Sequence, residues 1–232
     1  IEGINKKIPA IISNKYYSKF SNTQFIVKNI DAEKQKLLNY LKPNKPINSI
    51  AITGTNGKSS VAWFISEICR INNINSKMQG TLGYYVNGIK NKNERLTTPS
   101  FEILWQNSFS KQKNKFNYIF EASSHALYQN RIKNFPINIA AITNISQDHL
   151  DYHKTFKNYL NSKLILFKKL MKKDSYVIFD NDSNISSKIK KISNNNLKNL
   201  NIGKKHSNLK IIDHKFINLE QKITFSFNKK VF

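Results

Sequence analysis

The chain has 232 residues, and its 38 lysines and arginines against 14 aspartates and glutamates give a formal net charge of +24. A hydrophobic fraction of 39% and an aromatic fraction of 12% exclude a disordered polybasic tail. One cysteine excludes an internal disulfide, and the longest apolar runs are much shorter than the ~20 residues of a membrane span. We therefore expect one or two folded domains, no membrane insertion, and a reducing compartment such as the cytoplasm. Because the chain begins with Ile1 and no charged segment followed by an apolar one comes after it, we expect a piece of a longer soluble protein or a processed form.

The positive charge allows three interpretations. It can reflect compositional bias, since lysine, asparagine and isoleucine are all over-used; it can attract phosphate-rich small molecules; or it can bind nucleic acid. The lysines are scattered rather than gathered among aromatic residues. This distribution favours compositional bias, and we predict no nucleic-acid partner.

The first part of the chain predicts the end of a small α/β domain. Apolar runs at 10–12 and 24–27 predict two strands, and the leucine spacing predicts a helix over 31–41. The segment 42–46 holds two prolines among polar residues, which is typical of a linker. We therefore expect a domain boundary after residues 1–43.

Residues 44–232 alternate between short apolar strands and amphipathic helices. The main predicted elements are the strands 49–53, 116–120, 139–143 and 176–179 and the helices 59–71 and 155–172. This order predicts an α/β fold of P-loop type, with a mostly parallel sheet and helices on both faces. The residues expected on the buried face of the first of these helices are Val61, Phe64, Ile65 and Ile68.

The sequence patterns that predict helices and strands become weaker toward the end of the chain. The asparagine-rich tract 193–201 predicts an exposed polar loop. Two later runs, 209–212 and 223–227, predict edge strands.

A glycine-rich segment connects the strand 49–53 to the helix that follows it. The residues expected to bind nucleotide phosphates are Gly54, Thr55, Asn56, Gly57, Lys58, Ser59 and Ser60. Glycines allow backbone N–H groups to point at an anion, Lys58 supplies a positive charge, and the Ser59 hydroxyl can bind Mg²⁺. Ile52 stands where the common pattern G-x-x-x-x-G-K-[ST] has glycine, so an ordinary glycine-rich turn is the alternative.

Polar side chains also follow the strand 116–120. Ligands in parallel sheets gather at the carboxyl ends of strands, where Glu121 can hold Mg²⁺. The alternative is that Ser123 or Ser124 caps a helix while Glu121 is a solvated charge. Thr98 likewise precedes a proline and can be explained as the cap of a helix.

Two further features suggest chemistry near this edge. After the strand 139–143, two histidines and two aspartates lie close together, although His149 is an unusual Mg²⁺ ligand. The apolar stripe predicted for helix 155–172 consists of Phe156, Leu160, Leu164, Phe167 and Met171. Lys163 lies within that stripe, so burial should lower its pKa toward a neutral amine, which CO₂ can convert to a carbamate. The alternative is a lysine whose head reaches water.

These motifs resemble a known family. Residues 53–59, Thr-Gly-Thr-Asn-Gly-Lys-Ser, resemble the phosphate loop of the Mur ligases and folylpolyglutamate synthases, which are ATP-dependent amide ligases that activate a carboxylate as an acyl phosphate. The run 121–131, Glu-Ala-Ser-Ser-His-Ala-Leu-x-Gln-x-Arg, and the run 148–153, Asp-His-Leu-Asp-Tyr-His, resemble one Mur branch. That branch adds a diamino acid to UDP-N-acetylmuramoyl-L-alanyl-D-glutamate.

The resemblance implies a role for each matching residue. Lys58, His149 and a carbamylated Lys163 would be catalytic, Asn144 would join the nucleotide site, and Mg²⁺ would bind to Ser59, Glu121 and His149. The residues implied to contact the UDP-sugar peptide are Thr97, Thr98, Ser123, Gln129 and Arg131.

The resemblance also implies three domains, of which this chain would hold the tail of the UDP-binding domain (1–43) and most of the ATP-binding central domain (44–232). The expected product is an amide with a diamino acid such as meso-diaminopimelate, made by a cytoplasmic monomer in peptidoglycan synthesis. Two alternatives remain: a sibling such as folylpolyglutamate synthase, and a nucleotide- or nucleic-acid-binding module without ligase chemistry.

Overall fold

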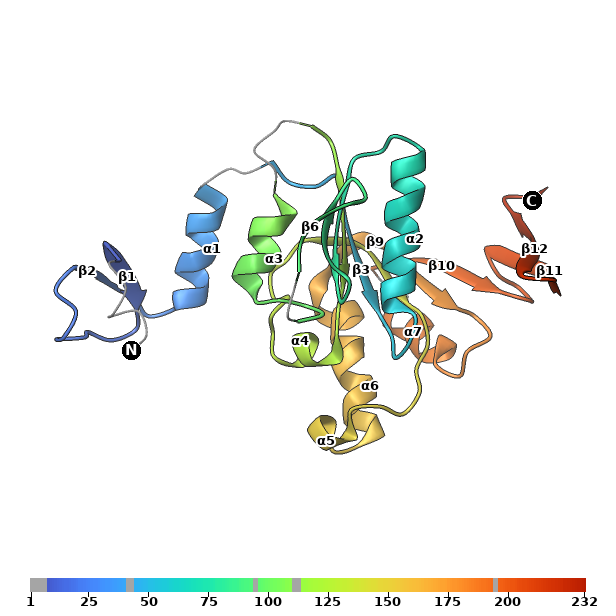
Figure 1. Cartoon of the computed structure of the whole chain (residues 1–232). Coiled ribbons are helices and arrows are strands. Elements are labelled where there is room, and N and C mark those ends of the chain that lie inside the picture. The colour runs from blue at the N-terminus through green and yellow to red at the C-terminus, as the bar shows by residue number, and fades with distance from the viewer. Residues whose placement is uncertain (1–7, 41–43, 94–95, 110–113, 194–195) are drawn as a thin grey trace. The chain divides into compact units, whose positions relative to one another are not determined.

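A computed structural model divides the chain into two compact units, Ile1–Asn44 and Lys45–Phe232 (Figure 1). The residues that it describes are 8–40, 44–93, 96–109, 114–193 and 196–232.

The first unit is a small α/β element. Its strands β1 (Ala10–Ser13) and β2 (Thr23–Ile26) pair in parallel, and helix α1 (Ile30–Tyr40) follows them. The two predicted strands and the predicted helix are therefore confirmed. The end of that predicted helix and the start of the predicted linker fall on 41–43, which lie outside the described residues.

The second unit is built on an 11-stranded sheet in the order β13-β12-β11-β10-β9-β8-β3-β7-β4-β5-β6, counted over the described residues. The strands from β11 to β4 are parallel, and the strands beyond them at both edges are antiparallel. The strands are β3 (Asn48–Thr53), β4 (Ser76–Gly80), β5 (Gly83–Val86), β6 (Ile89–Lys92), β7 (Asn117–Glu121), β8 (Ile137–Ile142), β9 (Met171–Asp180), β10 (Lys198–Gly203), β11 (Leu209–Ile217), β12 (Glu220–Phe227) and β13 (Lys230–Val231).

Helices cover both faces of this sheet, as Figure 1 shows for α2 and α3. Alternation along β7 explains the arrangement, since Ile119 packs in the cluster under α2 while Tyr118 and Phe120 contact Phe135 on the other face. Trp105 of α3 also contacts Phe135. The helices are α2 (Lys58–Ile71), α3 (Phe101–Ser108), α4 (Ser124–Tyr128), α5 (Leu150–His153), α6 (Phe156–Ile165), the π-helical turn η1 (Leu166–Leu170) and α7 (Ser186–Ser193). Within the described ranges, none is long and apolar enough to cross a bilayer.

The buried face of α2 differs from the prediction. Small residues, among them Ala62 and Cys69, lie against the sheet, and Val61 and Ile65 flank the cluster there. The two remaining residues of the predicted face point to solvent; they are Phe64 and Ile68. The buried positions 62, 66 and 69 follow the three- to four-residue spacing of one helix face, so this face holds small side chains and the larger Phe64 and Ile68 lie beside it.

Two predictions in the second half of the chain are wrong in part. The predicted helix 155–172 ends earlier, because α6 stops at Ile165, one π-helical turn follows, and Met171 already begins β9. The tract 193–201 is not an exposed loop throughout, since Ser193 is buried and β10 pairs with both β9 and β11. Residues 194–195 of that tract lie outside the described residues.

The sheet order determines where the functional side chains meet. Strand β3 lies between β7 and β8, and all three are parallel. Ile52 is opposite Glu121 on one side, and Thr53 is opposite Ile142 on the other. The segments that follow these three strands therefore begin at one edge of the sheet.

Candidate functional site

The phosphate loop depends on two glycines for different reasons. Gly54 has φ +141°, and a Cβ there would lie 1.9 Å from Thr143 Oγ1 and 3.2 Å from the Asn144 backbone nitrogen. Gly57 has φ +79° in the left-handed region, and a Cβ there would meet nothing within 4 Å. The first turn of α2 therefore starts beside open space, and its N–H groups have no acceptor within the helix. This geometry fits an anion such as a nucleotide phosphate.

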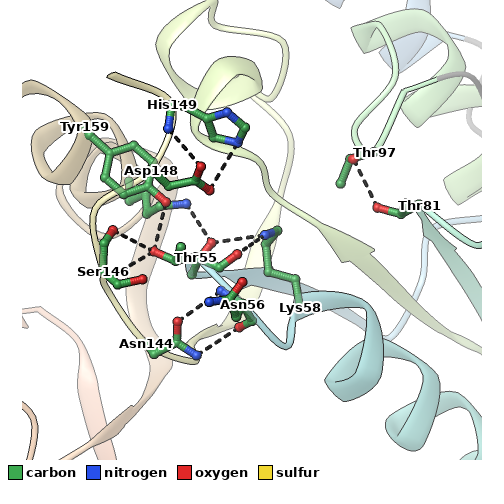
Figure 2. A network of polar contacts seen from close by, with 12 residues as sticks. Thr55, Asn56, Lys58, Thr81, Thr97, Asn144, Ser146, Asp148, His149 and Tyr159 are labelled. Atoms are coloured by element: carbon green, nitrogen blue, oxygen red, sulfur yellow. Dashed lines mark hydrogen bonds and ion pairs between the residues drawn. The ribbon is translucent and has the colours of Figure 1, made fainter. Parts of the chain in front are cut away.

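The segment after β8 holds this loop in place (Figure 2). Thr55 N donates to Asn144 O at 2.9 Å, and Asn56 N donates to Asn144 Oδ1 at 3.0 Å. Asn144 Nδ2 and Thr143 Oγ1 both donate to Asn56 O, at 3.0 and 2.6 Å. Asn144 thus supports the loop backbone through its side-chain amide.

Both predicted catalytic lysines converge on one carbonyl. Lys58 Nζ donates to Gly54 O at 3.1 Å and to Thr55 O at 2.8 Å, and Lys163 Nζ donates to Gly54 O at 2.7 Å. Lys163 is only 2% exposed, so the alternative of a head that reaches water is wrong. Burial, and then the charge of Lys58, lowers the pKa of Lys163 to about 7, while Asp148 opposes the change. Burial also lowers the pKa of Lys58.

Glu121 is a buried carboxylate with its own fixed partner. It is 1% exposed, and Thr81 binds it through N–H to Oε1 at 2.8 Å and through Oγ1 to Oε2 at 3.3 Å. A Cβ on Gly80 would lie 2.0 Å from Glu121 Oε1, so any larger residue there would displace the Glu121 carboxylate. The alternative of a solvated Glu121 is wrong. Thr81 also contacts Thr97 through their hydroxyls at 3.0 Å.

The predicted substrate residues form one hydrogen-bonded network. Thr98 Oγ1 donates to Glu121 O at 2.6 Å and accepts from Ser123 N at 3.0 Å, and Arg131 Nη1 donates to Thr98 O at 2.9 Å. Arg131 also donates to Gln129 Oε1. Thr98 does not cap α3, whose N-cap is Ser100. Ser123 does cap α4, as the alternative predicted, by accepting from Ala126 N at 3.2 Å.

A cavity of about 320 Å³ joins the loop to this network. Its lining includes the predicted residues Lys58, Thr97, Thr98, Ser123, Arg131, His149 and Lys163. The lining also includes Ser124, which the sequence suggested only as a helix cap, and three residues to which the sequence assigned no individual role, Leu96, His125 and Tyr159. The predicted site residues outside this lining are Gly54, Thr55, Asn56, Gly57, Ser59, Ser60, Glu121, Gln129 and Asn144.

His149 lines this cavity and remains half-exposed. It has φ +50°, its side chain is 48% exposed, and its Nε2 lies 3.4 Å from Asp148 Oδ2. His125 contacts it edge to face, with ring centroids 4.9 Å apart. His149 is the N-cap of α5, and its left-handed backbone conformation turns the chain from the segment after β8 into that helix.

The donor set fits Mg²⁺ only in part. No group of three His, Cys, Asp or Glu side chains that could hold a metal occurs among the described residues. Mg²⁺ typically binds through one or two carboxylates together with phosphate oxygens and water. One buried carboxylate, Glu121, beside the phosphate loop is consistent with that mode.

The sequence matches the Mur ligase middle domain over residues 52–231. The chain belongs to the Mur ligase family. A UDP-N-acetylmuramoyl-L-alanyl-D-glutamate--2,6-diaminopimelate ligase of Rickettsia bellii (strain RML369-C) is 40% identical over 166 residues, which are 70% of this chain and 35% of that protein. The ligase of the same name from Rickettsia montanensis is 35% identical over 209 residues, or 88% of this chain and 43% of that protein. This Mur ligase chain thus spans less than half the length of these relatives.

Solved structures agree with the family. A UDP-N-acetylmuramoyl-L-alanyl-D-glutamate--2,6-diaminopimelate ligase superposes with a TM-score of 0.78 at 26% identity, covering 96% of this chain and 46% of that one. MurF ligase from Thermotoga maritima, solved in complex with ADP, superposes with a TM-score of 0.67 at 16% identity, covering 100% of this chain and 50% of that one. At that identity the second likeness shows the fold alone.

Proposed function

We propose that this Mur ligase chain is the nucleotide-binding part of an ATP-dependent ligase that adds a diamino acid, such as meso-diaminopimelate, to UDP-N-acetylmuramoyl-L-alanyl-D-glutamate. The observation that carries the proposal is the shared cavity. Lys58 and Lys163, next to the phosphate loop, line the same cavity as three predicted substrate residues, Thr98, Ser123 and Arg131. The names of the relatives support this choice of substrates.

The proposed reaction has two steps. A carboxylate oxygen of the D-glutamate residue attacks the γ-phosphorus of ATP, and the bond between that phosphorus and the bridging oxygen of ADP breaks. The amine of the diamino acid then attacks the acyl carbon, phosphate leaves, and the nitrogen loses a proton. Lys58 and the N–H groups of the first turn of α2 would offset the phosphate charge.

Several residues of this chain would bind Mg²⁺ and the UDP-sugar peptide. Ser59, Glu121 and His149 would hold the metal, which supplies positive charge beside the phosphates when it is bound. Thr97, Thr98, Ser123, Gln129 and Arg131 would bind the UDP-sugar peptide. Arg131 suits an anionic partner because its guanidinium donates in a fixed planar pattern.

The modified lysine is part of the same proposal. A pKa of about 7 leaves much of the Lys163 amine neutral near pH 7, and a neutral amine can attack CO₂ to form a carbamate with loss of one proton. The carbamate anion would replace the present contact with Gly54 O and would help to organise the metal site.

We propose that residues 1–43 are the tail of a UDP-binding domain and that residues 44–232 are most of the central ATP-binding domain. We further propose that the protein is cytoplasmic, since its use of ATP and its single thiol fit a reducing, ATP-containing compartment. We also propose that it is a monomer.

Release of ADP tests the proposed activity. The longer protein that we expect to contain this chain should release ADP from ATP when UDP-N-acetylmuramoyl-L-alanyl-D-glutamate and meso-diaminopimelate are both present. Equal release with a carboxylate that lacks the dipeptide would contradict the proposal and favour a sibling ligase. Salt-sensitive binding to duplex DNA without any ATP dependence would favour a module without ligase chemistry.

Two lysines on one helix test the role of the carbamate. Lys163→Ala should reduce turnover by about 10³-fold or more, and short carboxylic acids should restore part of it by replacing the missing anion. Lys157 is exposed on the same helix, so Lys157→Ala is the matched control and should keep full activity. Full activity in Lys163→Ala would exclude the carbamate.

A further inference from the structure

We propose that Tyr159 is a positioning residue that holds the phosphate loop and the Lys163 amine in one fixed arrangement. The inference rests on the proposed nucleotide site, since it concerns the loop that would bind the phosphates. Tyr159 is fully buried in α6, and it lines the cavity with Lys58 and Lys163. Figure 2 shows the hydroxyl of Tyr159 and Ser146 both in contact with Thr55 of the loop.

The hydroxyl of Tyr159 completes the hydrogen bonding of one loop side chain. Thr55 Oγ1 lies 3.1 Å from Ser146 O, 3.0 Å from Ser146 N and 2.9 Å from Tyr159 Oη. Ser146 N–H donates to Thr55 Oγ1, and Thr55 has one proton to give to either Ser146 O or Tyr159 Oη. If that proton goes to Ser146 O, which can only accept, Tyr159 Oη donates to Thr55 and all three contacts are hydrogen bonds. This buried hydroxyl is thereby fully satisfied, and the loop is fixed to two other segments.

The ring of Tyr159 contacts the second partner. In the unmodified chain, Lys163 Nζ lies 4.6 Å from the ring centroid, so the ring packs directly beside the amine. The two residues are four positions apart on one helix, so their side chains lie on the same side of it. Lys163 also donates to Gly54 O, next to Thr55. Two adjacent loop residues are thus linked to α6, one through Tyr159 and one through Lys163.

The start of α6 is itself fixed, which gives Tyr159 a rigid base. Tyr159 N donates to Thr155 O at 3.0 Å, and Thr155 Oγ1 caps the helix by accepting from Asn158 N at 3.2 Å. A tyrosine anchored in this way can transmit the position of α6 to the loop. A residue that merely fills space there would affect stability without changing the loop.

Substitution of Tyr159 separates these possibilities. Tyr159→Phe keeps the ring beside Lys163 and removes only the bond to Thr55. We expect the dissociation constant for ADP, measured by calorimetry, to rise about three- to tenfold, as loss of one buried hydrogen bond predicts. Tyr159→Leu also removes the ring and should weaken ADP binding further. Tyr176→Phe, the same change at a half-exposed tyrosine of β9, is the control and should leave ADP binding unchanged.

Hydrogen exchange gives a second readout that needs no nucleotide. Amide exchange at Thr55 and Ser146 should accelerate at least fivefold in Tyr159→Phe but not in Tyr176→Phe, since ~1 kcal/mol of local stability is lost. Unchanged exchange at both amides, or equal ADP affinity of wild type and Tyr159→Phe, would overturn the role of Tyr159. Equal affinity of the Phe and Leu variants would overturn the role of the ring. A wild-type protein that fails to bind ADP but shows the exchange difference would overturn the proposed function and leave the role of Tyr159 standing.

Discussion

Two regions of the second unit differ in which side chains they enclose and which they expose. At the carboxyl edge of β3, β7 and β8, charged groups are enclosed, with Glu121 1% and Lys163 2% exposed. In the ribbon of β11, β12 and β13, large apolar side chains are open to solvent, with Phe216 72% exposed and Leu219 completely so. Polarity therefore does not decide which residues of this unit are buried.

The difference lies in the number of partners each side chain has. The buried charged groups at the edge are paired, as Glu121 is with Thr81 and Lys163 with Gly54, whereas Thr53 Oγ1 and Ser124 Oγ are buried without a hydrogen-bond partner among the described residues. A buried polar group whose partner is removed costs the full desolvation of that group, whereas an exposed apolar side chain loses little when it is shortened. Sensitivity to substitution should accordingly concentrate at the edge.

The two loop glycines should show the largest contrast within the edge itself. Gly54→Ala should destabilise the chain by about 4 kcal/mol or more, because its Cβ would overlap Thr143 Oγ1 and the φ of +141° is unfavourable for alanine. Gly57→Ala has space for the new atom and should cost only ~1–2 kcal/mol for a left-handed alanine. Urea unfolding followed by tryptophan fluorescence measures both, since Trp63 and Trp105 lie in this unit. Equal losses would show that the close approach at Gly54 does not matter.

Lys163 should give the next largest effect, as a dependence on pH. Its pKa is about 7 in the folded chain and near 10.5 in the unfolded one, so the unfolded chain binds more protons between these values. The contribution of Lys163 to stability therefore rises with pH from 7 to about 10, and the burial penalty is greatest below pH 7.

Lys163→Met removes that dependence. The difference in unfolding free energy between Lys163→Met and wild type should change by about 3 kcal/mol between pH 7 and 10, in favour of the wild type as pH rises. Other lysines with lowered pKa values, such as Lys58, contribute to both proteins and largely cancel. The titration is done in CO₂-depleted buffer, so that no carbamate forms. Parallel curves would show that Lys163 is not a buried cation.

Thr98 should have a smaller effect through neutral hydrogen bonds. Thr98→Val leaves Glu121 O and Ser123 N without the partner that they share, so we expect a loss of about 2 kcal/mol. Thr98→Ser keeps the hydroxyl and should cost less than ~1 kcal/mol. Urea midpoints of the two variants distinguish lost hydrogen bonding from lost methyl packing, and equal midpoints would contradict the hydrogen-bond explanation.

The elements around the phosphate loop could be predicted because their signals are local. An apolar run predicted β3, the glycines with Lys58 predicted the loop, and the spacing around Leu160 placed Lys163 inward. In each case the relevant residues lie within one or two helical turns of one another, so the sequence contains the whole pattern.

Other features depend on partners far away in the sequence. Strand β4 was not predicted because it reads Ser-Lys-Met-Gln-Gly, and its buried Gln79 accepts hydrogen bonds from Asn107 and Tyr118. The roles of Thr81 and Tyr159 depend on contacts with Glu121 and Thr55, 40 and 104 residues away. Strand β10 is asparagine-rich but pairs on both sides, so position in the sheet outweighs its weak strand propensity.

Substitutions in the ribbon should have the smallest effect on the unfolding free energy. Leu219 lies in the turn between β11 and β12 and is completely exposed. Leu219→Ser should change the unfolding free energy of this chain by less than ~0.5 kcal/mol, because the leucine buries no area that could be lost. Leu160→Ser, the same change at a buried leucine of α6, is the matched control and should cost several times more, about 3 kcal/mol. Similar losses at the two positions would mean that Leu219 is buried in solution, and the contrast between edge and ribbon would then fail.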